Sequence, residues 1–447
     1  MGQDTHIAVT DQPGAADGGR AAGWVERDRR RVWHGFTQMA AYPDNRPVMV
    51  ERAEGRELID VDGRRYLDAI SSLWVTTLGH RVPELDRALK DQADRVAHST
   101  LLGNGNTVVV ELAEQLAGVV PVDDPRFLFA SDGAAAVEQA LKIAFQYWWN
   151  LGERGRDRYL VLGDAYHGDT VGSLSLGDGG FGTDMFDPLR FPGVLRSPGY
   201  RHRDWLPRAL EVLSSASRSL AAVVMEPVVQ GAAGMYVADP GDVAAFAEAC
   251  RQAGVLVVFD EVATGFGRTG EMFASQLCRV RPDLMTIGKG LSGGYLPMSA
   301  TVASGPVAEA FEGEDLGPRT FYHGHSFGGN ALAAAVALRH LALLEEWDVM
   351  GNVRARAQQM RGLLDGLSGL DAVGEVRSCG LMAGVELRPP APGRRWGRRV
   401  CAAAVDRGVL LRPLGDVVVL MPILTSTAGE IDRIVAVLAE AIESACR

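Results

Sequence analysis

Short apolar runs alternate with amphipathic stretches through the middle of the chain. Five segments begin as apolar runs of strand length, namely "FLFAS", "YLVLGDAYHGD", "LAAVVMEPVVQG", "VLVVFDEVATGFGRTG" and "LMTIGKGLSGG". Between them, segments such as "AAAVEQALKIAFQYWWNLG" and "PGDVAAFAEACRQAG" carry apolar residues at the spacing of a helix. Near-continuous apolar strands separated by helices indicate a mostly parallel sheet that is covered on both faces. The pattern therefore predicts an α/β fold.

The segments on either side of this region have a different character. "VMVERAEGRELIDVDGRRYLDA" contains two short strand-like stretches joined by turn signals. After residue 330, helical segments are followed by "EVRSCGLMAGVEL", "GVLLRPLGD" and "VVVLMPILTS", which we expect to form a second, smaller sheet. The predicted organisation is a disordered leader (1–23), the N-terminal segment of a small α+β domain (24–80), a large domain (81–340) and the C-terminal part of the small domain (341–447).

Composition and charge argue against several classes of function. The chain has 447 residues and a formal net charge of −11, whereas a nucleic-acid partner would favour a basic face. No apolar run is long enough to span a bilayer, and the five cysteines lack the spacing of a disulfide framework or a zinc site. His167, His323 and His325 also lack the arrangement of metal ligands. We therefore expect a cytoplasmic protein with no metal and no nucleic-acid or membrane partner.

Polar residues directly follow several of the predicted strands. In a sheet of this kind, ligands bind at the carboxyl ends of the strands. We therefore expect the polar residues at these ends to line one common site. The residues at these positions are Asp132, Gly133, Tyr166, His167, Gly168, Asp169, Glu226, Asp260, Glu261 and Lys289.

Lys289 is one of only three lysines, with Lys90 and Lys142, in a chain that otherwise uses arginine. An amine placed after an apolar strand is partly desolvated, which lowers its pKa and makes it a nucleophile that forms Schiff bases with carbonyl groups. A guanidinium group stays protonated and cannot do this. The alternative interpretation is a lysine that caps the strand end or pairs with a carboxylate.

Three further features suit a cofactor beside this amine. Asp260 ends a strand, where its carboxylate could pair with a protonated pyridine nitrogen such as that of pyridoxal 5′-phosphate (PLP). Gly133 and Ala134 open a predicted helix, whose first N–H groups bind anions, and Tyr166 offers a flat ring for stacking. Taken singly, these residues also suit a loop cap, an ordinary helix start and a core aromatic side chain.

Two neighbouring motifs carry a resemblance to a known family. "FDEVATGFGRTGEMFAS", followed by "PDLMTIGKGLSGGYLPMSA", resembles the signature of the class III PLP-dependent aminotransferases. The resemblance extends from about residue 30 to the C-terminus. It implies the fold-type I architecture, PLP as the cofactor, a small-molecule amino donor and keto acceptor, and a homodimer with active sites at the subunit interface.

The resemblance also assigns roles to the residues at the strand ends. It implies that Lys289 is the Schiff-base lysine, that Asp260 pairs with the pyridine nitrogen and that Tyr166 stacks on the cofactor ring. These three would be the catalytic residues. Gly133 and Ala134 would hold the phosphate group of the cofactor.

Within the family, the chain most resembles the branch that converts 8-amino-7-oxononanoate to 7,8-diaminononanoate in biotin biosynthesis. The matching segments are "HGFTQMAAY", "SSLW", "EPVVQGAAGM", "YHGHSFGGNALAAAVAL" and "RPLGDVVVLMP". This likeness implies that Ser326 reaches the phosphate from the neighbouring subunit. It also implies that Phe36, Trp74 and Tyr166 line the substrate pocket and that Arg412 holds the substrate carboxylate.

Three departures from the family pattern bear on these expectations. Asp132 stands where many members have serine before the glycine of the phosphate turn, so a carboxylate lies near the expected phosphate. Ala232 replaces a glutamate found in many ornithine and 4-aminobutyrate enzymes, which disfavours those substrates. "HGFT", "HGHS" and Leu73-Trp74 resemble the members that use lysine, instead of S-adenosylmethionine, as amino donor. The donor stays open between these two, and another ω-amino acid or diamine transaminase remains the alternative function.

Overall fold

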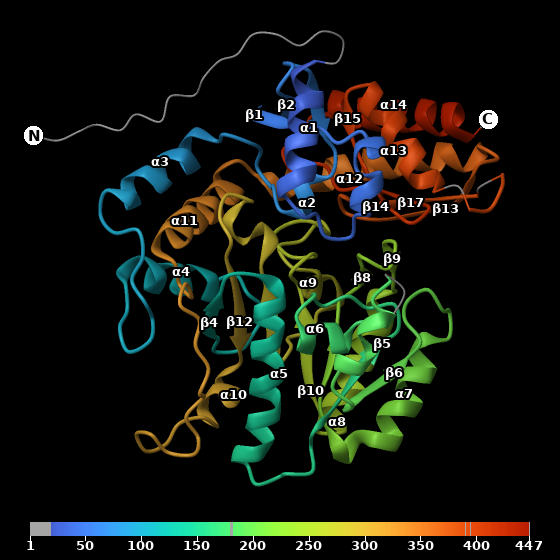
Figure 1. Cartoon of the computed structure of the whole chain (residues 1–447). Coiled ribbons are helices and arrows are strands. Elements are labelled where there is room, and N and C mark those ends of the chain that lie inside the picture. Colours follow the sequence, from blue (N-terminus) through green and yellow to red (C-terminus); the bar gives the residue numbers. More distant parts are fainter. Residues whose placement is uncertain (1–18, 179–181, 389, 394, 447) are drawn as a thin grey trace, which may run out of the picture.

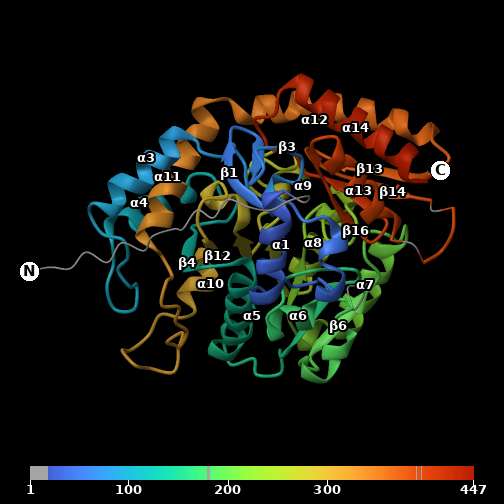
Figure 2. The same ribbon diagram turned by 45° about the horizontal axis from the view of Figure 1, so that its top comes forward.

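The computed structural model describes residues 19–178, 182–388, 390–393 and 395–446. Figure 1 shows a large sheet in the lower part of the molecule, with two smaller sheets and the C-terminal helices above it. In the turned view of Figure 2, α12 (Val349–Asp365) and α14 (Ala428–Cys446) run across the top. The predicted α/β architecture with a mostly parallel sheet is confirmed.

Among the described residues, the large sheet has seven strands in the order β4-β12-β11-β10-β7-β5-β6. The pairings from β11 to β6 are all parallel, and β12 runs antiparallel to its neighbours β11 and β4. The carboxyl ends of β4, β5, β7, β10 and β11 therefore meet at one edge. The strands are β4 (Arg126–Ala130), β5 (Arg158–Leu162), β6 (Val194–Ser197), β7 (Leu220–Met225), β10 (Leu256–Asp260), β11 (Leu284–Ile287) and β12 (Ser299–Ala303).

Alternate residues of the central strands face opposite layers of helices. Leu256 and Val258 of β10 pack in the core that contains α5 (Gly133–Asn150). Val257 and Phe259 pack in the core that contains α7 (Trp205–Ala216) and α8 (Pro240–Gln252). Because both faces of the strand are covered, its sequence is apolar throughout until Asp260 at its end.

The described residues also form shorter and peripheral helices. They are α1 (Arg20–Arg31), α2 (Ser71–Trp74), α3 (Pro83–Ala93), α4 (Thr107–Ala117), α6 (Val171–Leu176), α9 (Ala274–Cys278), α10 (Gly305–Glu309), α11 (Ala331–Glu346) and α13 (Trp396–Asp406). Among the helices in the described ranges, none combines the length and apolar character needed to cross a lipid bilayer.

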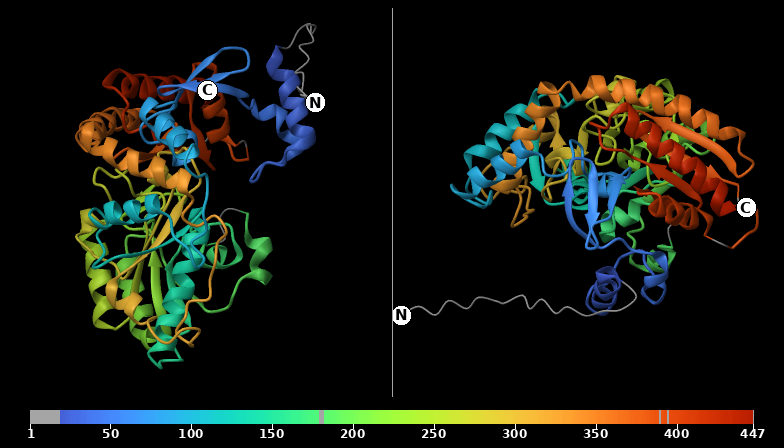
Figure 3. Two further views of the ribbon diagram at one scale, coloured as in Figure 1. Left: turned by 90° about the vertical axis from the view of Figure 1, so that its left-hand side faces the viewer. Right: turned by 90° about the horizontal axis from the view of Figure 1, so that it is seen from above.

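The N-terminal helix α1 lies at the margin of the molecule in both views of Figure 3, and none of its side chains is buried. Of the predicted disordered leader, residues 1–18 lie outside the described residues. The prediction is wrong for residues 20–23, which form the first turn of α1. That turn is held by Arg20, whose Nη1 donates to the carbonyl oxygen of Val61 at 2.7 Å.

One of the two smaller sheets combines strands from both ends of the chain, and the other comes from the C-terminal part alone. One has the order β1-β2-β3-β15, the other β13-β14-β17-β16, and a two-stranded ribbon joins β8 and β9. The strands are β1 (Val50–Glu54), β2 (Glu57–Asp60), β3 (Arg65–Asp68), β8 (Val229–Gln230), β9 (Tyr236–Val237), β13 (Val373–Cys379), β14 (Met382–Leu387), β15 (Val409–Leu410), β16 (Arg412–Leu414) and β17 (Val417–Leu420).

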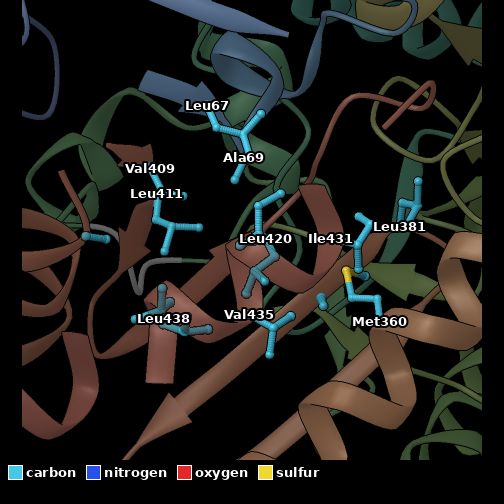
Figure 4. Packing of buried hydrophobic residues seen from close by; sticks show 14 of the residues in the cluster. Leu67, Ala69, Met360, Leu381, Val409, Leu411, Leu420, Ile431, Val435 and Leu438 are labelled. Atoms are coloured by element: carbon cyan, nitrogen blue, oxygen red, sulfur yellow. The ribbon is translucent and has the colours of Figure 1, made fainter. Parts of the chain in front are cut away.

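Two details of the predicted small sheet are wrong. The N-terminal segment contains three strands instead of two, because β3 is completed by a parallel partner, β15, from the far end of the chain. "GVLLRPLGD" does not form one strand, since β15 joins β3 whereas β16 pairs with β17. Figure 4 shows the shared core, in which Leu67 and Ala69 lie with Val409, Leu411 and Leu420.

Candidate active site

A cavity of about 470 Å³ lies at the edge where the strand ends meet. It is lined by the residues that follow β4, β5, β7, β10 and β11, together with Trp74 from α2. The structure thus brings together six of the predicted site residues at one place. They are Trp74, Gly133, Ala134, Tyr166, Asp260 and Lys289.

Lys289 follows β11 and begins a short 3-10 turn, Lys289–Ser292, with its own backbone in the left-handed region (φ 38°). Its Nζ lies 5.6 Å from the centre of the Trp74 ring, inside the cavity. Burial lowers the pKa of Lys289, and the negative charges of Asp260 and Glu226 oppose this only in part. The neutral form of the amine is therefore more favoured in this site than it is in aqueous solution.

The glycine after Lys289 is required by packing within the chain. A Cβ at Gly290 would lie 3.0 Å from the Cβ of Phe266 and 3.2 Å from Thr77. The small residue lets the turn sit against these side chains, which fixes where the lysine leaves the backbone.

Asp260 is the last residue of β10 and is buried. Its Oδ2 lies 2.7 Å from Nδ1 of His167. Its Oδ1 accepts hydrogen bonds from the Thr286 hydroxyl at 3.0 Å and from the Val262 N–H at 3.1 Å. Asp260 therefore caps the following loop and also lines the cavity.

His167 lines the cavity as predicted, but its pairing with Asp260 was not predicted from the sequence. Burial acts to lower the pKa of His167, but the hydrogen bond and charge of Asp260, with the charge of Glu226, raise it overall. Its buried Nε2 has no hydrogen-bond partner among the described residues. Its contact with Asp260 depends on the spatial order of β5, β7 and β10, which the sequence does not reveal.

Glu226 follows β7 and joins two walls of the cavity. Its carboxylate accepts hydrogen bonds from the Tyr166 N–H at 3.4 Å and from the Gly231 N–H at 2.9 Å. Burial raises the pKa of Glu226 to about 7, with a smaller contribution from Asp260, whereas His167 acts in the opposite direction. Glu226 thus links the loop that carries Tyr166 to the segment at Gly231.

The N-terminus of α5 opens into the cavity at Gly133 and Ala134. Asp132 is the N-cap, and its Oδ1 accepts from the Ala135 N–H at 2.9 Å. A Cβ at Gly133 would come 2.7 Å from Cγ1 of Val262, so a larger residue there would force the Val262 side chain to shift. The N–H groups of Gly133 and Ala134 have no intrahelical acceptor at this position, and this leaves them suited to an anion.

Tyr166 lies on the loop after β5, and its hydroxyl donates to Oδ2 of Asp169 at 2.8 Å. The end of this loop is held by Glu138 of α5, whose Oε1 accepts from the Thr170 hydroxyl at 2.5 Å and the Gly172 N–H at 2.8 Å. One helix, α5, therefore provides the anion-binding N–H groups and also positions the loop that carries Tyr166.

Trp74 closes the cavity from a strained segment. Ser71, Ser72 and Trp74 all have positive φ, at 53°, 61° and 66°. Such conformations are rare for residues with a side chain and persist only when the surroundings enforce them. A Cβ at Gly231 would lie 3.2 Å from the Trp74 ring, so the glycine leaves room for the ring in its observed position. The buried Nε1 of Trp74 has no hydrogen-bond partner in the part of the chain that the structure describes.

The other three predicted residues lie outside this cavity. Phe36 is 62% exposed and Arg412 is exposed on β16. Ser326 is exposed on the segment before α11, where its carbonyl oxygen accepts from Nε2 of His98 at 2.7 Å. Within the described ranges, no group of three or more His, Cys, Asp or Glu side chains could hold a metal ion.

The arrangement suits a flat, phosphorylated ring with a basic nitrogen. Asp260 could pair with the protonated nitrogen, the N–H groups of Gly133 and Ala134 could bind the phosphate, and the amine of Lys289 could react with a carbonyl carbon. Nε2 of His167 and Nε1 of Trp74 are buried polar atoms at the site for which the described residues supply no hydrogen-bond partner.

Comparison with known proteins gives consistent results. The family described as "Aminotransferase class-III" matches residues 39–442. The adenosylmethionine-8-amino-7-oxononanoate aminotransferase of Nitratidesulfovibrio vulgaris is 43% identical, over 91% of this chain and 79% of its own. The crystal structure of the enzyme of that name from Methanocaldococcus jannaschii covers 95% of this chain and 99% of its own, with 36% identity and a TM-score of 0.92. An ω-transaminase from Pseudomonas jessenii in complex with PMP covers 94% and 97%, with 29% identity and a TM-score of 0.89.

Proposed function

The chain belongs to the class-III aminotransferase family, and we propose that it converts 8-amino-7-oxononanoate to 7,8-diaminononanoate, a step of biotin biosynthesis. The observation that carries the proposal is the buried amine of Lys289, which shares one cavity with the Asp260–His167 pair and lies 5.6 Å from the centre of the Trp74 ring. Relatives with this activity in their names match nearly the whole chain, which supports the choice of substrate.

We propose PLP as the cofactor, since members of this family depend on it. When bound, PLP withdraws electrons from the carbon that carries the amino group. The carboxylate of Asp260 would keep the pyridine nitrogen protonated, and the ring of Tyr166 would lie against the cofactor. The N–H groups of Gly133 and Ala134 would bind the phosphate, with the hydroxyl of Ser326 from a second copy of the chain.

Lys289 would move the proton in both halves of the reaction. Its lowered pKa favours the neutral amine, which can accept a proton at Nζ from the carbon of the donor and return it to the acceptor.

The proposed acceptor has an apolar chain that ends in a carboxylate. Trp74 and the small, neutral Ala232 provide apolar wall in the cavity, which suits such a chain. We retain Arg412 as the proposed partner of the carboxylate and Phe36 as a further substrate contact. Both side chains are exposed and thus accessible to a ligand or a second copy of the chain.

We also propose a homodimer that shares its active sites and works in the cytoplasm. Exposed apolar side chains support an interface between two copies of the chain. They lie after α1 (Trp33, Phe36) and on the segment before α11 (Tyr322, Phe327). All five cysteines are unpaired, which agrees with a reducing compartment. Light scattering measures the oligomeric state, and a monomer at micromolar concentration would contradict the proposed homodimer.

The decisive experiment supplies 8-amino-7-oxononanoate with PLP and either S-adenosylmethionine or lysine. Formation of diaminononanoate, measured by mass spectrometry, is expected with one of the donors. The names of the relatives favour adenosylmethionine, whereas the "HGFT" and "HGHS" segments favour lysine. The likeness to the Pseudomonas jessenii enzyme supports an ω-transaminase as second candidate. Transamination of ω-amino donors without any diaminononanoate would favour that candidate.

A further inference from the structure

The carboxylate of Asp132 stands beside the anion-binding end of α5 without a cation to balance it. It lines the same cavity as Gly133 and Ala134 and is exposed to it. Its only hydrogen bond among the described residues is the one accepted from the Ala135 N–H, at 2.9 Å. Ser299 fixes the backbone here, since its hydroxyl donates to the Asp132 carbonyl oxygen at 2.6 Å. The carboxylate is therefore held close to the N–H groups that would receive a phosphate.

The other three carboxylates of the cavity are each engaged by the protein. Asp260 is paired with His167, Asp169 accepts from the Tyr166 hydroxyl, and Glu226 accepts two N–H groups. The only basic side chains that line the cavity are those of Lys289 and His167. No charge in the described lining thus offsets Asp132 at the helix end.

We propose that Asp132 limits the affinity of the site for its phosphorylated cofactor by electrostatic repulsion of the phosphate group. The inference rests on the proposed binding of PLP at Gly133 and Ala134. The helix dipole and the free N–H groups attract the phosphate, and the fixed carboxylate opposes them at short range. The cofactor is then held in readily exchangeable form, so the loaded fraction of the enzyme follows the supply of PLP.

The substitution Asp132→Asn isolates this effect. Asparagine is as good an N-cap as aspartate, so the hydrogen bond to the Ala135 N–H and the helix start are preserved while the charge is removed. We expect the dissociation constant of PLP to fall by about tenfold, as for one charge at a helix N-terminus in a partly buried setting. The dissociation constant of pyridoxal, which has the same ring and aldehyde but no phosphate, should change less than about twofold.

Equilibrium titration of the full-length, cofactor-stripped protein, followed by absorbance, measures both constants. The difference between wild type and Asp132→Asn should shrink as salt rises from about 0.05 to 0.5 M, because screening weakens the repulsion. Glu111→Gln removes a charge from the exposed face of α4, outside the cavity, and should leave both constants unchanged.

Three outcomes separate this inference from the proposed function. Tighter PLP binding with unchanged pyridoxal binding supports the role of Asp132. An unchanged PLP constant, or equal changes for PLP and pyridoxal, overturns it and leaves the aminotransferase assignment intact. Failure of wild type to bind PLP at all would instead contradict the proposed function on which the inference rests.

Discussion

His167 and Asp260 form a buried pair in which the imidazole Nδ1 lies 2.7 Å from the carboxylate Oδ2. Because Thr286 and the Val262 N–H hold the other oxygen, both oxygens of Asp260 have partners within the protein. The carboxylate therefore has a fixed orientation before any ligand binds, and no reorganisation is needed when a positive charge arrives.

Replacing His167 by asparagine should weaken this pair and destabilise the fold. The substitution removes a charge-assisted partner from a buried carboxylate, which costs about 1–3 kcal/mol of unfolding free energy. Since the pKa of His167 is raised above its ordinary value of 6.5, the stabilisation is fully present below pH 6.5. It is lost as the pH rises through the raised pKa of the folded state. Urea denaturation of wild type and His167→Asn between pH 5 and about 9 measures the difference.

The matched control for this prediction is His202→Asn, at an exposed position outside the cavity. Its unfolding free energy should stay within about 0.5 kcal/mol of wild type at each pH. A difference between wild type and His167→Asn that grows with rising pH would contradict the raised pKa.

The sequence predicted the strand-end residues well because burial leaves a clear local signal. Apolar runs ended by Asp260 or Lys289 can be read without knowing the strand order, since every parallel strand ends at the same edge. The pairing of His167 with Asp260 could not be predicted, because two strands that lie far apart in the sequence must first take their places in the sheet.

The ends of the chain were harder to predict for a related reason. Strands β3 and β15 are 4 and 2 residues long, and each depends on the other as its neighbour. Their pairing joins residues 65–68 to 409–410, which no local pattern reports. Phe36, Ser326 and Arg412 lie outside the cavity, and their roles stay predictions.

Glu226→Gln should make the unfolding free energy of the protein less dependent on pH. Burial raises the pKa of Glu226 from 4.5 to about 7, so the folded state binds this proton more tightly than the unfolded state. Protonation of Glu226 therefore stabilises the folded state, and this stabilisation is fully present below pH 4.5. As the pH rises from 4.5 to about 7, the unfolding free energy loses about 3 kcal/mol from this group. Across that range, the unfolding free energy of wild type should fall more steeply than that of Glu226→Gln. Parallel curves from urea denaturation would show that the carboxyl group is ionised throughout.

Lys289→Arg should abolish transamination although it keeps the positive charge. A guanidinium group cannot act as the nucleophile or exchange the proton at neutral pH, so we expect a loss of about a thousandfold or more in kcat. Steady-state kinetics measures this loss, with circular dichroism as the check on folding. Lys90→Arg, on the exposed side of α3, is the matched control and should retain wild-type activity.

Gly133→Ala should disturb the start of α5 through a single contact. The added Cβ would lie 2.7 Å from Cγ1 of Val262, a clash that we expect to cost about 1–3 kcal/mol. Val262→Ala in the same chain removes that methyl group and should restore most of the thermal stability. Gly155→Ala, where a Cβ meets nothing within 4 Å, is the control and should leave Tm unchanged. Failure of the double variant to recover would show that the contact with Val262 is not the cause of the destabilisation.

Glu138 couples α5 to the loop that carries Tyr166. Its Oε1 accepts hydrogen bonds from Thr170, Gly172 and, at 3.1 Å, from the Ser173 N–H. Glu138→Ala should release the loop, with faster hydrogen exchange over residues 166–176 and faster dissociation of PLP. Glu138→Gln keeps an acceptor oxygen of the same reach and should restore most of the protection.

Two comparisons distinguish local positioning by Glu138 from a general loss of stability. Hydrogen exchange in β10 reports global opening and should change far less than exchange in the loop, because the core strands of the large sheet open only with the whole domain. Glu114→Ala removes an exposed carboxylate from α4 and should affect neither region. Equal acceleration of exchange in β10 and in the loop would mean that Glu138 stabilises the fold as a whole and does not position Tyr166.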